Sequence, residues 1–251
     1  MAICSIETFI EETNQASSSQ TVCALFGNAL KCLGFDRFCY SLITAHPSLG
    51  LDAGHGIVKN YPDDWMSYYE ANHYEKLDPV PQQAFASLWP FIWDSLEKIR
   101  ELKPEQKTIM NEAREAKLLD GVGIPICGHN GELAGVGVAS SLGGTRPDKN
   151  LLSKLRALAH QFHLAYTDLE KTERCAEANI RNVHLTSREK EILQWAAEGK
   201  SDAIIADIIG VSHSTIRFHM NNIFKKLNAN ERTLATVKAI RHGLILPSYV
   251  S

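Results

Sequence analysis

The sequence predicts an α+β chain of two domains: an N-terminal α/β/α sandwich with an antiparallel sheet of about five strands, and a C-terminal domain made only of helices. Short runs of β-branched and aromatic residues alternate with helical patterns up to residue 172, and only helical patterns follow residue 185. A length of 251 residues is near the limit of one hydrophobic core. Charge divides the chain as well, because residues 176–251 carry a net +3 and the remaining residues carry −6. This asymmetry indicates that only the C-terminal domain meets a polyanion.

The composition is that of an ordinary globular protein, with 44% hydrophobic and 22% charged residues. No apolar run approaches the ~20 residues that cross a bilayer, and the N-terminus lacks a basic stretch followed by a long apolar segment. We therefore expect a cytoplasmic protein without a membrane partner. The six cysteines form no CxxC pair and sit mostly in apolar stretches, which favours buried thiols over zinc or disulfides, so no metal site is expected.

The first elements alternate between helix and strand. Residues 5–31 show apolar spacings of three and four interrupted by a polar run at 13–21, which predicts two helices. The next elements expected are a strand at 35–44, a short strand at 56–59 after a Gly-containing loop, a helix opened by Pro62, a helix start or turn at Pro81, a short aromatic strand at 89–93, and a helix at 105–118.

A hairpin and a long helix complete the front domain. Two apolar runs, 122–127 and 133–140, flank an Asn-Gly pair, which is the strongest short-range hairpin signal. An amphipathic helix follows at 148–172, and its Leu-rich stripe can pack on the sheet or on a second copy of the chain. Few apolar residues occur afterwards. We therefore place the domains at 1–172 and 185–251, with a linker at 173–184.

The C-terminal domain contains two helices joined by a tight turn. One helix spans 201–209, the turn is Gly210-Val211-Ser212, and the next helix spans 214–227 with a buried apolar stripe. This arrangement is typical of a helix-turn-helix motif. Arg and Asn side chains match the edges of guanine and adenine, and lysines near the helix end meet phosphates. The predicted DNA-binding residues are Ser214, Thr215, Arg217, Phe218, Asn221, Lys225 and Lys226.

The whole tail, from LTSREKEILQWAAEGK onward, resembles the DNA-binding domain of LuxR-type regulators. The residues that fall at the family's spacing are Glu189, Leu193, Gly199, Thr215, His219, Asn222, Ile223, Lys226 and Leu227. The same domain also ends response regulators driven by phosphorylation. Such a receiver needs an acidic pair after its first strand, an aspartate after its third and a lysine after its fifth, and nothing in the front domain follows that pattern.

Instead, the segment NYPDDWMSYYEANHYEKLDP followed by PFIWD resembles the signal-binding domain of acyl-homoserine-lactone receptors, the quorum-sensing branch of the family. Tyr61, Trp65, Tyr69, Asp78-Pro79 and Trp93 match that branch's pocket pattern. An acyl-homoserine lactone suits an apolar pocket with few convergent polar groups. The resemblance implies that Trp65 meets the lactone carbonyl, Tyr61 the acyl carbonyl and Asp78 the amide.

The resemblance also implies that Tyr69 and Trp93 wall the pocket and that Ala139, which stands where relatives often carry Ser, is a ligand-binding residue as well. Two further positions depart from the family pattern. Lys117 replaces a usual Gly, so the sequence predicts that a positive φ is avoided there. Val80 lacks a hydroxyl that some relatives supply. These positions predict a pocket with fewer polar groups than usual. Two alternatives therefore stay open: a regulator that acts without a ligand, and one that responds to a molecule other than a lactone.

Plainer interpretations compete with each part of the site. The aromatic residues could serve only as core, and Asp78 could merely start a turn. An enzyme that modifies its ligand is the alternative from another class, but the sequence has no metal cluster, nucleophile elbow or phosphate-binding glycine loop. We therefore assign no catalytic residue and expect no cofactor besides the signal. One small helix-turn-helix reads few bases, so we expect a homodimer on double-stranded DNA, with RNA polymerase as a further candidate partner.

Overall fold

A five-stranded antiparallel sheet with the order β2-β1-β5-β4-β3 forms the centre of the N-terminal part of the chain. The computed structural model describes residues 5–44, 53–128, 132–177 and 184–246, and the boundary between its two structural units falls near residue 178. The strands are β1 (Arg37–Leu42), β2 (Gly54–Lys59), β3 (Phe91–Ile92), β4 (Leu119–Cys127) and β5 (Leu133–Ser140).

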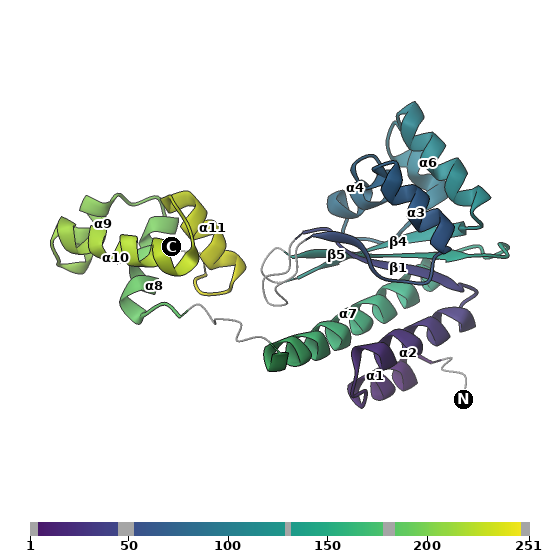
Figure 1. Ribbon diagram of the computed structural model, residues 1–251, viewed down its shortest axis with the longest axis horizontal. Coiled ribbons are helices and arrows are strands. Elements are labelled where there is room, and N and C mark those ends of the chain that lie inside the picture. Colours follow the sequence, from purple (N-terminus) through teal and green to yellow (C-terminus); the bar gives the residue numbers. More distant parts are fainter. Residues whose placement is uncertain (1–4, 45–52, 129–131, 178–183, 247–251) are drawn as a thin grey trace. The chain divides into compact units, whose positions relative to one another are not determined.

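Helices cover both faces of this sheet, which confirms the predicted sandwich (Figure 1). One face is covered by α1 (Ile6–Asn14), α2 (Ser19–Cys32) and α7 (Lys149–Glu177). The other face carries α3 (Asp63–Ala71), α4 (Pro79–Ala86) and α6 (Pro104–Glu115), together with the short helices η2 (Tyr74–Lys76), η3 (Trp93–Ser95) and α5 (Leu96–Ile99). The two layers therefore have different tasks, a packed core on one side and the candidate site on the other.

The first layer is a continuous apolar core. Ser5 and Ser18 cap α1 and α2, and the predicted polar interruption separates the two helices. The rings of Phe26 and Phe162 stack with centroids 4.4 Å apart, and Leu155 on α7 is fully buried. The apolar stripe of α7 thus packs on the sheet and its helices, which is one of the two roles that the sequence left open.

Element boundaries differ from the sequence prediction by a few residues in several places, and three of these differences affect the architecture or the site. Helix α7 continues to Glu177, beyond the expected end at 172, because good helix formers follow and neither Gly nor Pro interrupts them. Helix α4 begins at Pro79, with Asp78 as its N-cap, two residues before Pro81. Strand β3 has only two residues, since Trp93 already belongs to η3. The predicted Asn-Gly turn lies outside the described residues.

The C-terminal part contains four helices among its described residues: α8 (Ser187–Ala197), α9 (Asp202–Ile209), α10 (His213–Leu227) and α11 (Arg232–Arg241). Gly210 ends α9 with a φ of +69°, and Ser212 caps α10. Ile205, Ile216 and Ile223 are fully buried in a separate core. The predicted helix-turn-helix is therefore present as α9, a short turn and α10.

The prediction for Lys117 is wrong, because this residue adopts a φ of +58°. It lies just beyond the end of α6, where the amides of Lys117 and Leu118 donate to the carbonyls of Arg114 and Ala113, both at 2.9 Å. This pair of hydrogen bonds is the Schellman motif, which requires a left-handed residue at that position. The buried Leu118 side chain fixes the turn, so the backbone geometry survives the loss of glycine.

We predict that Lys117→Gly raises the free energy of unfolding by about 0.5–1 kcal/mol. Glycine removes the strain of an L side chain in the left-handed region, and the greater conformational entropy of glycine in the unfolded chain offsets part of this gain. Asn228→Gly is the matched control. Asn228 ends α10 at a φ of +47°, and asparagine tolerates this region, so its gain should be smaller. Thermal and urea unfolding of both variants measure the difference, and a less stable Lys117→Gly protein would contradict this account.

Candidate functional site

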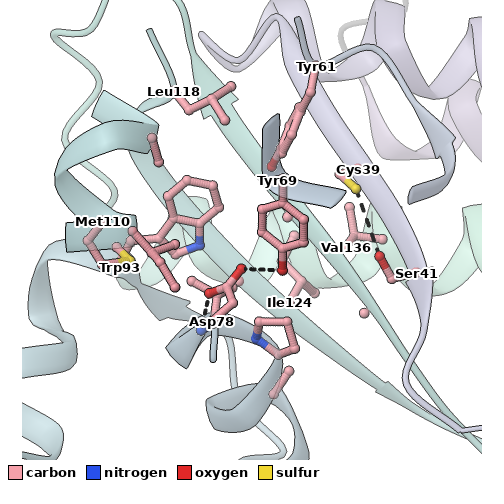
Figure 2. Close-up of a pocket in the computed structure, with 18 of the residues that line it drawn as sticks. Cys39, Ser41, Tyr61, Tyr69, Asp78, Trp93, Met110, Leu118, Ile124 and Val136 are labelled. Atoms are coloured by element: carbon pink, nitrogen blue, oxygen red, sulfur yellow. Dashed lines mark hydrogen bonds between the residues drawn. The ribbon is translucent and has the colours of Figure 1, made fainter. Parts of the chain in front are cut away.

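A narrow cavity of about 70 Å³ lies between the sheet and the helices of its second face. Five of the six residues predicted to bind a ligand line it: Tyr61, Trp65, Tyr69, Asp78 and Trp93. Tyr61, Tyr69, Asp78 and Trp93 project into the same space in Figure 2. The rest of the lining is mostly apolar and comes from β1, α4, α6, β4 and β5. The sequence pattern therefore converges on one place in the fold.

Ala139 is the exception, and its contact with a ligand stays a prediction. It is fully buried in the cluster beside the cavity but does not line the cavity itself. Gly137, two residues earlier on the same face of β5, does line it. Alternation along a strand places Gly137 and Ala139 on the same face of β5, but it does not tell how far along the strand the cavity extends. Cys39 and Ser41 also line the cavity and carried no signal that singled them out.

The aromatic side chains are positioned by helix α3 and by glycines of the sheet. Trp65 and Tyr69 are four residues apart on α3, which brings them to one side of this helix, and Tyr61 lies just before its N-cap Pro62. Trp93 lies against β4, where a Cβ on Gly121 would come within 1.9 Å of its ring. Only a residue without a side chain at Gly121 leaves room for the indole, so Gly121 and Trp93 form one structural unit.

Asp78 is a buried carboxylate with two roles. One oxygen accepts from the backbone amide of Val80 at 2.8 Å, which caps α4, and the other accepts from the hydroxyl of Tyr69 at 2.9 Å. Burial raises the pKa of Asp78 to about 6, although both hydrogen bonds oppose the rise. Burial and the nearby Asp78 also hold the pKa of Tyr69 far above its ordinary value, so Tyr69 remains a donor. The turn-forming interpretation is thus correct and coexists with a place in the cavity wall.

Two donors of the cavity wall have no partner. Among the described residues, the buried side-chain polar atoms without a hydrogen bond are Tyr61 Oη, Trp93 Nε1 and Arg37 Nε. Tyr61 and Trp93 both line the cavity. An unsatisfied buried donor costs about 1–3 kcal/mol, so its occurrence calls for a physical reason. A ligand carrying acceptor oxygens would satisfy both groups.

A second candidate site lies on the outer face of α10. Its buried stripe consists of Ile216, Met220, Ile223 and Leu227, as predicted. The side chains of Arg217, Asn221 and Lys225 are exposed, and Phe218 is 63% exposed, which is unusual for a large aromatic residue. Ser214 and Thr215 lie in the first turn of the helix, and their hydroxyls lie 2.7 and 2.8 Å from Ser212 Oγ. This face offers side chains suited to base edges and phosphates.

Lys226 has a role that the sequence did not reveal. Its ammonium donates to the carboxylate of Glu189 at 2.7 Å, and the side chain of Glu189 is only 4% exposed. Burial would raise the pKa of Glu189, but the hydrogen bonds from Lys226 and Thr186 outweigh it and hold this pKa below the ordinary value. Lys226 therefore links α8 to α10, and its DNA-binding role stays a prediction beside that of the exposed Lys225.

The two candidate sites define a class of protein, a transcriptional regulator that joins a small-molecule pocket to a helix-turn-helix domain. The comparisons agree with this class. Residues 18–166 match the family described as "Autoinducer binding domain", and residues 183–239 match "Bacterial regulatory proteins, luxR family". The chain belongs to the LuxR family of transcriptional regulators and carries the autoinducer-binding domain of its quorum-sensing members.

Similar proteins include several named quorum-sensing regulators. The chain is 33% identical to the HTH-type quorum sensing-dependent transcriptional regulator RpaR of Rhodopseudomonas palustris, over 75% of this chain and 74% of RpaR. It is 32% identical to the HTH-type quorum-sensing regulator RhlR of Pseudomonas aeruginosa, over 93% of both chains. Both relatives are named as regulators, in agreement with the class that the two candidate sites define.

The fold also matches a solved structure over nearly the whole chain. SdiA of Escherichia coli is 26% identical, with a TM-score of 0.75 over 96% of this chain and 98% of SdiA. A second SdiA structure, a complex with octanoyl-rac-glycerol, has a TM-score of 0.68 at 25% identity over 95% of this chain and 94% of SdiA. The fold described above is thus shared with SdiA.

We predict that Asp78 makes the stability of the unliganded protein depend on pH. Its folded pKa of about 6 lies above its unfolded value near 3.8, so the protonated form favours folding. This contribution is fully present below about pH 4 and is lost as pH rises through 6, a change of roughly 2–3 kcal/mol. Asp78→Asn should remove it. Unfolding free energies of both proteins between pH 4 and 8 test this, and parallel pH profiles would contradict the shifted pKa.

We predict different effects for two exposed residues of α10. Arg217→Ala should cost roughly 1–3 kcal/mol on the preferred DNA site and relax its specificity at one base pair, because arginine reads a guanine edge. Lys225→Ala should weaken all sequences alike and lower the salt slope by about one, because it contacts phosphate. Titrations on specific and random DNA at several salt concentrations measure both effects.

Lys226 is the matched control for this pair. Lys226→Ala should lower the stability of the C-terminal domain by about 1–3 kcal/mol, because it leaves the Glu189 carboxylate buried without its cation. Thermal unfolding separates this loss from a direct DNA effect. Equal loss on specific and random DNA in Arg217→Ala would sink the assignment of base reading.

Proposed function

We propose that this regulator binds an N-acyl-homoserine lactone in its N-terminal cavity and, as a homodimer, binds an inverted-repeat promoter site through its C-terminal domain. The observation that carries the ligand proposal is a mostly apolar cavity in which one buried carboxylate lies with two unsatisfied donors. A molecule with an apolar tail, an N–H donor and carbonyl acceptors has the complementary chemistry.

The roles within the cavity follow from donor and acceptor character. An ionised Asp78 can only accept, and its oxygens retain capacity beyond the bonds from Tyr69 and Val80, so it suits the ligand amide N–H. Tyr61 Oη is buried without a partner and suits the acyl carbonyl. Trp65 lines the same cavity and presents an indole for the lactone carbonyl. The apolar side chains of the wall enclose the tail.

A lipid-like molecule is the second candidate. One of the two SdiA structures is a complex with octanoyl-rac-glycerol, an acyl chain on a head group without an amide. Asp78 can accept from a hydroxyl as well as from an N–H, and Val80 supplies no hydroxyl of its own beside it. A regulator that needs no ligand is less well supported, because the protein's own side chains leave Tyr61 and Trp93 without partners.

The DNA proposal uses the exposed face of α10. A homodimer presents two such faces, and half-site centres about one helical turn apart would follow. Pairing makes the second contact intramolecular and raises affinity without new residues. RNA polymerase is a further proposed partner, and the cytoplasm is the proposed compartment because the DNA partner is there. No helix within the described ranges is long and apolar enough to cross a membrane.

Expression with and without a panel of acyl-homoserine lactones, followed by mass spectrometry of extracted small molecules, tests the ligand class. A bound lactone should also raise stability by about 2.7 kcal/mol at a hundredfold excess over Kd, because it binds only the folded state. Octanoyl-rac-glycerol belongs in the same panel. Recovery of that lipid alone would favour the second candidate, and an unchanged Tm with every compound would favour a ligand-independent regulator.

Substitutions then assign the roles of the cavity residues. Asp78→Asn should weaken the dose response clearly with the fold retained, since it keeps one acceptor oxygen and removes the charge. Asp78→Ala should lose more. Trp65→Phe deletes the indole donor and keeps most of the packing, and Trp89→Phe is its control because Trp89 is 67% exposed and lies outside the cavity. Wild-type potency in both Asp78 variants would leave Asp78 with its capping role alone.

A further inference from the structure

We infer that Trp93 is a hydrogen-bond donor to the polar head group of the signal, through its indole Nε1, and not only a wall of the cavity. The inference rests on the proposed function and names a contact that the sequence pattern did not assign. Nε1 is buried, Trp93 as a whole is 8% exposed, and the nitrogen has no partner among the described residues. A buried indole N–H usually finds an acceptor, so this one is poised for a group from outside the chain.

The position of the indole is built into the sheet. A Cβ on Gly121 would lie 1.9 Å from Cε3 and 2.1 Å from Cδ2 of Trp93, closer than any neighbour could approach. Trp93 begins η3 directly after β3, and β3 pairs with β4 beside Gly123. A dedicated glycine and a sheet register therefore fix the ring that carries the unsatisfied donor. Such rigidity is what a donor needs in order to select an acceptor at one place.

The second unsatisfied donor lies next to it. A Cβ on Gly137 would be 2.8 Å from Tyr61 Oη and 3.3 Å from Cζ2 of Trp93, so both residues border the same bare stretch of β5. Burial keeps the pKa of Tyr61 well above its ordinary value, which leaves this hydroxyl a donor as well. A side chain with a hydroxyl at position 137 would occupy this space. With glycine there, the acceptor must come from the ligand.

The head group is the part of the ligand that reaches Trp93. Asp78 holds the only charge among the described residues of the cavity lining, and Trp93 and Asp78 border the same part of the cavity in Figure 2. In an acyl-homoserine lactone the amide N–H, which Asp78 would accept, is attached directly to the lactone ring. The acyl carbonyl on the other side of the amide is the proposed partner of Tyr61. The geometry therefore points to a lactone oxygen as the acceptor for Trp93.

A matched pair of ligands isolates this contact. An acyl-homoserine lactone and the N-cyclopentyl amide with the same acyl chain share the tail, the amide and the acyl carbonyl, and only the first carries lactone oxygens. Trp93→Phe should weaken lactone binding about tenfold, the effect of one hydrogen bond in a dry site, and leave the cyclopentyl amide nearly unchanged. Tyr61→Phe is the control, because its partner is present in both compounds and it should weaken both equally. Calorimetry on the full chain measures the six affinities of the wild type and the two variants for the two compounds.

A nearly isosteric replacement separates the loss of the hydrogen bond from a loss of packing. Substitution of Trp93 by β-(3-benzothienyl)alanine replaces the N–H by sulfur and keeps the bicyclic shape. This variant should repeat the selective loss on the lactone, and without ligand its Tm should equal or exceed that of the wild type, because an unsatisfied donor has been removed. Equal losses on both ligands, or a lower Tm without ligand, would overturn the inference. If the wild type binds no lactone, the proposed function fails, and the Tm of this variant still tests whether Nε1 is unsatisfied.

Discussion

The carboxylate of Asp78 is the constraint on which the second face of the sheet depends. It begins α4 through Val80 and holds Tyr69 on α3, so one side chain joins two helices over the cavity. Burial is unfavourable for this charge and raises the pKa of Asp78 to about 6. A neutral side chain would therefore be easier to bury at this position than the carboxylate of Asp78. A structural cap and a ligand acceptor are compatible here because a carboxylate has more acceptor sites than the helix start uses.

Large rings and bare backbone create the cavity together. Trp93 and Phe91 lie over Gly121 and Gly123 of β4, where a Cβ would approach their rings to 1.9 and 2.3 Å. Tyr61 and Trp93 border Gly137 of β5 in the same way. The sheet thus offers flat backbone and the helices supply the side chains. This division leaves space in a molecule whose other layer, around Phe26 and Phe162, is closely packed.

The elements with strong local signals could be predicted from the sequence. The Gly210-Val211-Ser212 turn and the stripe of α10 depend on nearby residues, and both occur where the pattern placed them. The remaining features depend on tertiary contacts. The cavity is lined by Gly137 and not by Ala139 because of how far it extends along β5. The positive φ of Lys117 depends on the buried Leu118 beside it, and the ion pair of Lys226 depends on a carboxylate 37 residues away in the chain. No periodicity encodes such contacts.

The unsatisfied donors explain how a mostly apolar cavity can be selective. Apolar walls discriminate weakly among acyl tails, because each methylene contributes only about 0.8 kcal/mol and a tail can shift along the wall. Tyr61 and Trp93 act differently, since a ligand without an acceptor at either position leaves a buried donor unpaired at about 1–3 kcal/mol. Rejection of the wrong head group is therefore stronger than preference among tails. Val80 and Gly137 carry no hydroxyl, which increases this effect, because the fixed rings of Tyr61 and Trp93 have no partner within the described wall that could replace the ligand.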